Sequence, residues 1–135
     1  MSKTLKVKII TLNNIFVKEN ITKIFIKSHD GKVEIMPGHA PMIISIVPNI
    51  TVLENENGDK IELFTSKGVV NISKDEVTFC CDAAETKEEI DLERAKKSKE
   101  RAEDRLKDSK IYDAERAKLA LERANLRINL KKNSK

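Results

Sequence analysis

The chain has 135 residues, of which 26 are Lys or Arg and 22 are Asp or Glu, so its net charge is +4. This length allows one domain, or a small domain with an appendage. No apolar run approaches the ~20 residues that span a bilayer and no signal-peptide pattern opens the chain, so we expect a soluble cytoplasmic protein. The charge is uneven: residues 1–85 carry 10 basic and 11 acidic side chains, whereas residues 86–135 carry 16 and 11. The second segment therefore favours an acidic partner or a phosphate ligand.

The first 85 residues alternate apolar and polar side chains, the period of a half-buried β-strand. The pattern begins at Leu5, Val7 and Ile9, and further runs follow at Ile21–Lys27, Lys32–Met36, Met42–Val47, Thr51–Glu54, Lys60–Thr65, Val69–Ile72 and Val77–Cys81. Turn-forming pairs separate the runs, and Asn57-Gly58 predicts a hairpin with a type I′ turn. Short strands at this spacing predict two packed antiparallel sheets, a β-sandwich domain over residues 1–85.

This first half shows no catalytic or metal-binding pattern. The two histidines, His29 and His39, fall in turn regions, and no serine has a plausible His/Asp relay. The cysteines Cys80 and Cys81 are adjacent, so one is expected to be buried and the other exposed. We expect a docking scaffold in which His39 supports its loop by hydrogen bonds, and no enzyme.

Residues 86–135 contain no proline and no glycine, and they predict an antiparallel helical hairpin. Thr86-Lys87-Glu88-Glu89 matches a capping box, from which a first helix should run to about Lys107. Asp108-Ser109-Lys110 predicts a break, and Asp113 is the expected N-cap of a second helix that reaches roughly Leu130.

An arginine pattern repeats after 22 residues within this segment. The pairs Arg94-Ala95, Arg101-Ala102 and Arg105-Leu106 recur as Arg116-Ala117, Arg123-Ala124 and Arg127-Ile128. At about 100° per residue the alanines form a narrow apolar stripe, and the arginines follow one flank of it. Antiparallel helices packed stripe to stripe place both flanks on one face. Guanidinium groups in that arrangement suit phosphate oxygens, and a solvated charged face with scattered ion pairs is the alternative.

The apolar stripe also predicts a weak helix–helix contact. Alanine and serine bury little apolar area, at about 0.8 kcal/mol per CH₂, while ordering the backbone costs about 1–2 kcal/mol per residue. Closed and extended forms of the hairpin should therefore be close in energy. A ligand that bridges the two arginine rows would stabilise the closed form.

Two motifs and their order carry a family resemblance. They are Pro37-Gly38-His39-Ala40-Pro41 in the first half and Ile90-Asp91-Leu92-Glu93-Arg94-Ala95 in the second. With these motifs the chain resembles the epsilon subunits of F-type ATP synthases over nearly its full length. The resemblance implies a β-sandwich followed by a two-helix hairpin.

The same resemblance implies a non-catalytic subunit of the rotating central stalk, which couples ion-driven rotation to ATP synthesis. The sandwich would dock on the gamma subunit and the membrane ring of c subunits. The hairpin would reach the catalytic beta and alpha subunits and inhibit ATP hydrolysis. The subunit would be a peripheral protein at the cytoplasmic face of the cell membrane, with ATP as a regulatory ligand and no required cofactor.

A nucleotide site is implied as well. Its residues would be Glu85, Ile90, Asp91, Arg94, Ala95, Arg101, Arg123 and Arg127. Arg105 and Arg116 remain candidates for contacts with an acidic segment of the catalytic beta subunit. The alternative function is a nucleic-acid-binding module that uses the basic hairpin. The 11 acidic residues among 16 basic ones and the lack of an aromatic platform argue against it, so no nucleic acid is expected.

Overall fold

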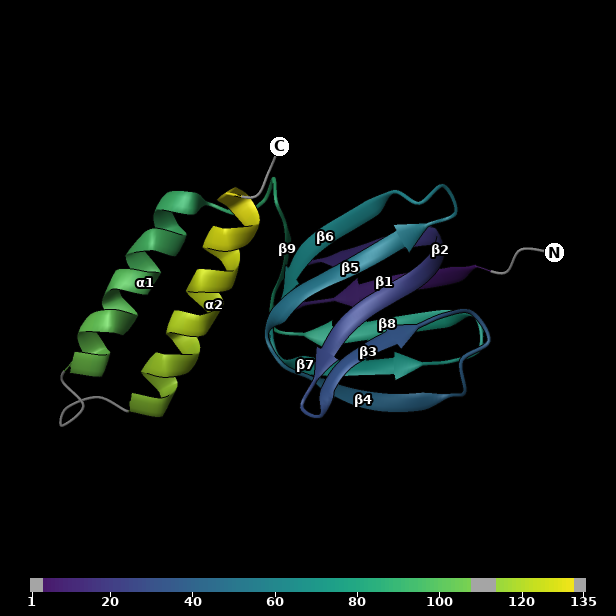
Figure 1. Ribbon diagram of the computed structural model, residues 1–135, viewed down its shortest axis with the longest axis horizontal. Helices are drawn as coiled ribbons and strands as arrows, with labels where there is room; N and C mark the ends of the chain where they lie inside the picture. The colour runs from purple at the N-terminus through teal and green to yellow at the C-terminus, as the bar shows by residue number, and fades with distance from the viewer. Residues whose placement is uncertain (1–3, 108–113, 133–135) are drawn as a thin grey trace. The chain divides into compact units, whose positions relative to one another are not determined.

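The structure is a computed structural model that describes residues 4–107 and 114–132 (Figure 1). The chain divides into two compact units, Met1–Thr86 and Lys87–Lys135. The described part of the first unit is built from strands and that of the second from two helices, which confirms the predicted fold class.

Nine strands form the described part of the first unit. They are β1 (Leu5–Ile10), β2 (Ile15–Ser28), β3 (Gly31–Ile35), β4 (Met42–Ile46), β5 (Asn49–Asn55), β6 (Lys60–Thr65), β7 (Gly68–Ile72), β8 (Glu76–Cys81) and β9 (Ala84–Thr86). Hydrogen-bonded neighbours follow the order β1-β8-β7-β4-β2-β5-β6-β9, while β3 pairs with β2. Because β1 also pairs with β2, the sheet closes on itself and surrounds the core (Figure 1).

One strand pair departs from the predicted antiparallel arrangement. Strand β1 runs parallel to β8, with Val7 opposite Val77 and Ile9 opposite Phe79. No hairpin joins these two strands, which come from opposite ends of the unit's sequence, so no turn forces them to be antiparallel. The other pairings of the described strands are antiparallel.

Strand β2 begins at Ile15, whereas the alternation predicts Ile21. Five of its first six side chains are exposed, and their order, three apolar residues followed by three polar ones, lacks the alternation that predicts a strand. Asn20 has a φ of +61°, in the left-handed region that asparagine tolerates. It lies next to the register shifts of β2 against β1 and β5, so it allows one long strand to change partners.

The β5–β6 hairpin is where the sequence predicts one, but its turn type differs. A type I′ turn requires a positive φ at both of its central residues. Among the described non-glycine residues only Asn20 has a positive φ, so Asn57 is not in such a turn. The Gly58 N–H donates to the Asn55 carbonyl at 3.1 Å, and Gly58 takes a φ of +83°. The Asn55 side-chain oxygen accepts the N–H groups of Asn57 and Asp59 at 2.9 and 3.0 Å. This side chain stabilises a three-residue loop that ends in a left-handed glycine.

The core of the first unit lies between the strands and is almost entirely aliphatic. Its fully buried side chains include Leu5, Val7, Ile9, Ile21, Ile24, Ile35, Leu53, Val70, Ile72, Val77 and Phe79. Cys81 is buried and Cys80 is exposed, as the alternation predicts. The His39 ring lies 2.9 Å from the Ala40 carbonyl through Nδ1, which confirms the predicted hydrogen bonding within its loop.

The second unit consists of α1 (Leu92–Lys107) and α2 (Ala114–Lys132), which pack side by side in antiparallel directions (Figure 1). The predicted start of the first helix immediately after Thr86 is wrong, because Thr86 ends β9, where it pairs with Leu63 of β6. The predicted break at 108–110 and the predicted N-cap Asp113 lie outside the described residues. None of the described helices is sufficiently long and apolar to span a membrane.

Candidate functional site

The contact between α1 and α2 is made of small side chains. Ala95, Ala102, Ala117 and Ala124 are 4, 2, 3 and 1% exposed, which confirms the predicted alanine stripe. Near the end of α2 the stripe continues with the buried Ile128. Alanines let the helices approach closely but remove little apolar area from water per residue. The two helices therefore lie close together, while their contact contributes little hydrophobic free energy.

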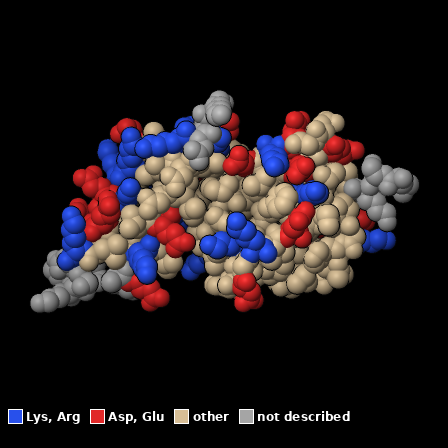
Figure 2. Space-filling model, viewed as in Figure 1, with Lys and Arg blue, Asp and Glu red and all other residues tan. Residues whose placement is uncertain are grey.

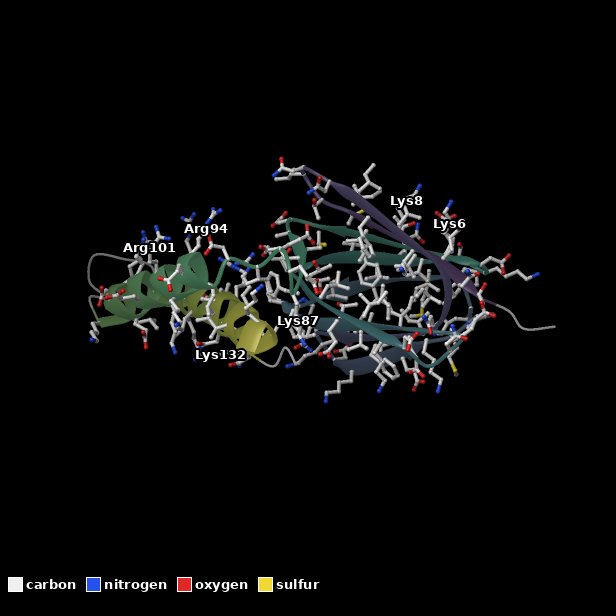
Figure 3. All side chains as sticks on the ribbon, turned by 90° about the horizontal axis from the view of Figure 1, so that it is seen from above. Lys6, Lys8, Lys87, Arg94, Arg101 and Lys132 are labelled. Atoms are coloured by element: carbon white, nitrogen blue, oxygen red, sulfur yellow. The ribbon has the colours of Figure 1, made fainter. Side chains whose placement is uncertain are left out.

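The arginines occupy the surface beside this stripe. Arg94, Arg101, Arg105 and Arg116 are exposed, whereas Arg123 and Arg127 of α2 are half-buried. Figure 3 shows Arg94 and Arg101 leaving the same side of α1. Lys and Arg side chains alternate with Asp and Glu over the visible face of the helical unit (Figure 2). The sequence pattern predicts that antiparallel packing of the two stripes places both arginine flanks on one face of the hairpin.

Helix α1 begins at Leu92, and the carboxylate of the preceding residue, Asp91, caps it. The Arg94 N–H donates to Asp91 Oδ1 at 3.1 Å, and the Ala95 N–H donates to the Asp91 carbonyl at 3.0 Å. An aspartate that accepts the amide three residues ahead satisfies one of the unpaired donors of the first turn. The residue before it, Ile90, is 3% exposed.

The signature segment therefore contains residues of two kinds. Ile90 and Ala95 are buried and act through packing, and Asp91 caps the helix. Arg94 is the exposed cation of the segment and can reach a ligand in solution. A six-residue motif thus places one guanidinium at a defined position beside the helix start.

The predicted site residues fall in both units. Glu85 is half-buried in β9 of the first unit, opposite Phe64 of β6. The seven others lie in the second unit, those from Ile90 to Arg101 in or just before α1, and Arg123 and Arg127 on α2.

Two contacts of the hairpin were missed by the sequence reasoning. Lys131 Nζ donates to the Lys87 carbonyl at 2.8 Å, which ties the end of α2 to the segment before α1. No local pattern signals a bond between residues 44 positions apart whose acceptor is a backbone carbonyl. Arg101 Nη2 donates to Ser98 Oγ at 3.3 Å, and the i,i+3 spacing on a helix was the available signal.

The described residues of the first unit form neither a metal site nor a reactive thiol at Cys81. Within residues 4–107 and 114–132, no group of three or more His, Cys, Asp or Glu side chains is placed to hold a metal ion. Burial, together with the nearby charge of Asp82, raises the pKa of Cys81 to about 11. This thiol therefore stays protonated near neutral pH and is a poor nucleophile.

Comparison with known proteins places both units in one family. Residues 4–87 match the β-sandwich domain of the ATP synthase delta/epsilon chain, and residues 88–132 match the long α-helix domain of the same chain. The ATP synthase epsilon chain of Clostridium botulinum (strain Eklund 17B / Type B) is 43% identical over 132 residues, which are 98% of each chain. That of Clostridium novyi (strain NT) is 40% identical over 130 residues, 96% of this chain and 99% of the relative.

A solved structure shares the fold. A chain in the structure of the Euglena gracilis mitochondrial ATP synthase, with OSCP, F1 and c-ring, aligns with a TM-score of 0.79 and 21% identity. The alignment covers 93% of this chain and 79% of that one. Both domain matches and the near full-length relatives lead to one conclusion: the chain belongs to the ATP synthase epsilon chain family.

Proposed function

We propose that this protein is a non-catalytic subunit of the rotating central stalk of an F-type ATP synthase, where it couples ion-driven rotation to ATP synthesis. The observation that carries the proposal is the match to ATP synthase epsilon chains at 43% identity over 98% of the chain. The match covers both units, so it supports the docking and the regulatory parts of the role together.

In this proposal the β-sandwich docks on the gamma subunit and on the ring of c subunits. Exposed apolar side chains of the first unit support a protein partner, since large apolar side chains on a surface favour association when they cluster. Ile43 of β4 and Val69 of β7 are 70 and 42% exposed and lie on neighbouring paired strands. Leu12 in the β1–β2 connection and Ile15 at the start of β2 are 86 and 66% exposed. The protein would thus be held at the cytoplasmic face of the cell membrane through its partners.

The helical hairpin is the regulatory element of the proposal. ATP bridges the arginine rows of α1 and α2, with Glu85, Ile90, Asp91, Arg94, Ala95, Arg101, Arg123 and Arg127 forming the site. No other cofactor is needed for this role. The alanine contact supports a switch, because a contact that buries little area can open at small cost in free energy. In the open state the hairpin reaches the beta and alpha subunits and inhibits ATP hydrolysis.

A hydrolysis assay tests the proposal. Purified catalytic heads that lack this subunit receive the full chain at equal concentration, and ATP hydrolysis is followed with time. We expect binding to the head and a several-fold fall in rate, which Arg105→Ala and Arg116→Ala should weaken through lost contacts to acidic residues. Lys97→Ala is the matched control, since Lys97 is an exposed cation of α1 outside the arginine rows. Absence of binding together with an unchanged rate would contradict the subunit assignment, and binding without inhibition would contradict the regulatory part alone.

A further inference from the structure

One hydrogen bond joins the two ends of the hairpin that the chain itself does not connect. The chain passes from α1 to α2 through residues 108–113, so the start of α1 and the end of α2 have no covalent link between them. At this end Lys131 Nζ donates to the Lys87 carbonyl at 2.8 Å, and both residues belong to the second unit. Because the two partners lie on segments that separate when the helices part, opening of the hairpin must break this bond.

The acceptor is held in place by the turn that precedes α1. The Lys87 carbonyl also accepts the Ile90 N–H at 3.3 Å, and Ile90 is 3% exposed. A carbonyl oxygen has two lone pairs, so it can accept both donors at once. The position of this oxygen is therefore set by the backbone of the turn, and Lys131 reaches a fixed target.

The donor has a close comparison in the next residue. Lys131 and Lys132 both lie in the last turn of α2, where a cation interacts favourably with the helix dipole. Lys132 is exposed, whereas Lys131 is half-buried and has the bond to the Lys87 carbonyl in addition. Figure 3 labels Lys87 and Lys132 in the helical unit. The two lysines thus share the dipole interaction and differ in the bond.

The bond is strong relative to the contact that it accompanies. Hydrogen bonds from a charged donor contribute more to stability than those between neutral groups. The alanines between α1 and α2 remove little apolar area from water, so one such bond is a considerable part of what keeps the hairpin closed. Ordering the lysine side chain offsets part of the gain. We expect the net effect on the ratio of open to closed forms to be about fivefold.

We propose that the bond from Lys131 Nζ to the Lys87 carbonyl is a latch that sets how often the hairpin opens, and that it acts without a nucleotide. The latch rests on the hairpin opening of the proposed function and is independent of the ATP site. It lies at the first residue of the second unit, so it closes the hairpin at the point from which the hairpin leaves the sandwich domain in sequence.

A distance measurement within the hairpin tests the latch. Spin labels at Glu93→Cys and Asn129→Cys, both exposed positions, are placed in the full chain with Cys80→Ser and Cys81→Ala, and no ATP is added. We expect a short and a long distance in this background, and Lys131→Met should raise the ratio of long to short about fivefold. Methionine keeps an unbranched side chain of good helix propensity and removes the charged donor.

Two variants separate the bond from the charge. Lys132→Met removes the same charge from the same helical turn and should leave the ratio as it is without that change. Lys131→Arg keeps a charged donor and should also keep that ratio. Circular dichroism of each variant checks that the helices persist.

The outcomes distinguish the latch from the rest of the proposed function. A ratio that Lys131→Met leaves unchanged, or that Lys132→Met raises equally, would overturn the latch while the opening of the hairpin stands. A single short distance in every variant would overturn the latch and the opening of the free chain together. The measurement contains neither ATP nor catalytic heads, so a failed nucleotide site or a failed inhibition assay leaves its result unaffected.

Discussion

At the scale of single residues, the two adjacent cysteines have different environments. Strand alternation places Cys80 on the outer face of β8 and Cys81 toward the core, where burial raises its pKa to about 11. The ordinary value is 9.0, so a protonated Cys81 contributes stability below about pH 9, and that contribution is lost as the pH rises through 11.

A thiol assay at pH 8 should therefore distinguish the two cysteines. With an aromatic disulfide reagent, we expect one thiol to react at once and the second only after unfolding in guanidinium chloride. Cys80→Ser should remove the fast reaction, and Cys81→Ala should leave it unchanged. Equal rates for both thiols in the folded protein would contradict the burial of Cys81.

In the hairpin, the sequence predicted the roles of some residues and not of others. The alanine stripe was predictable because burial on a helix follows its period, and Ala102 and Ala124 are buried as expected. The capping role of Asp91 was not predicted, because Thr86 with Glu89 offers an equally good local pattern five residues earlier. The pairing of Thr86 with Leu63 decides between them, and that contact is not local.

At the scale of elements, the β7–β8 pair depends on a glycine. A Cβ added at Gly68 would overlap the Cys80 carbonyl oxygen and lie 2.7 Å from Cys81 Cβ, so neither backbone could keep its place. Gly58 provides the contrast, since an added Cβ there meets nothing within 4 Å although its φ is +83°.

Gly68→Ala should therefore destabilise the sandwich by roughly 2–4 kcal/mol, through displacement of paired strands. Gly58→Ala, the matched control, should cost about 1 kcal/mol from left-handed backbone strain alone. Chemical denaturation followed by circular dichroism of the strands measures both. Equal losses in the two variants would mean that β7 and β8 are less closely packed than the structure shows.

The strands show which features of the sheet side-chain alternation predicts and which it does not. Alternation located eight of them because one face of each meets the core. It missed β9, whose three residues are all half-buried, and it missed the exposed first half of β2. The parallel β1–β8 pair depends on which distant strands meet, and side-chain periodicity carries no information about that choice.

At the scale of the whole molecule, charge and packing are divided between the two units. The first unit has an aliphatic core and nearly balanced charge, whereas the second has a thin alanine contact and a surplus of cations. The sequence alone predicted this division, since composition changes sharply near residue 86. A stable platform joined to a weakly closed, basic hairpin is suited to a part that moves in response to an anion.

A distance measurement between the units tests this central claim most directly. Spin labels at Lys32→Cys and Asn129→Cys, in a Cys80→Ser and Cys81→Ala background, report the separation of β3 and the end of α2. We predict two populations without ATP and a shift toward the shorter distance with ATP, because in the proposed switch the nucleotide stabilises the closed form. Arg94→Ala should abolish the shift. A single distance that ATP does not change would contradict a nucleotide-sensitive hairpin.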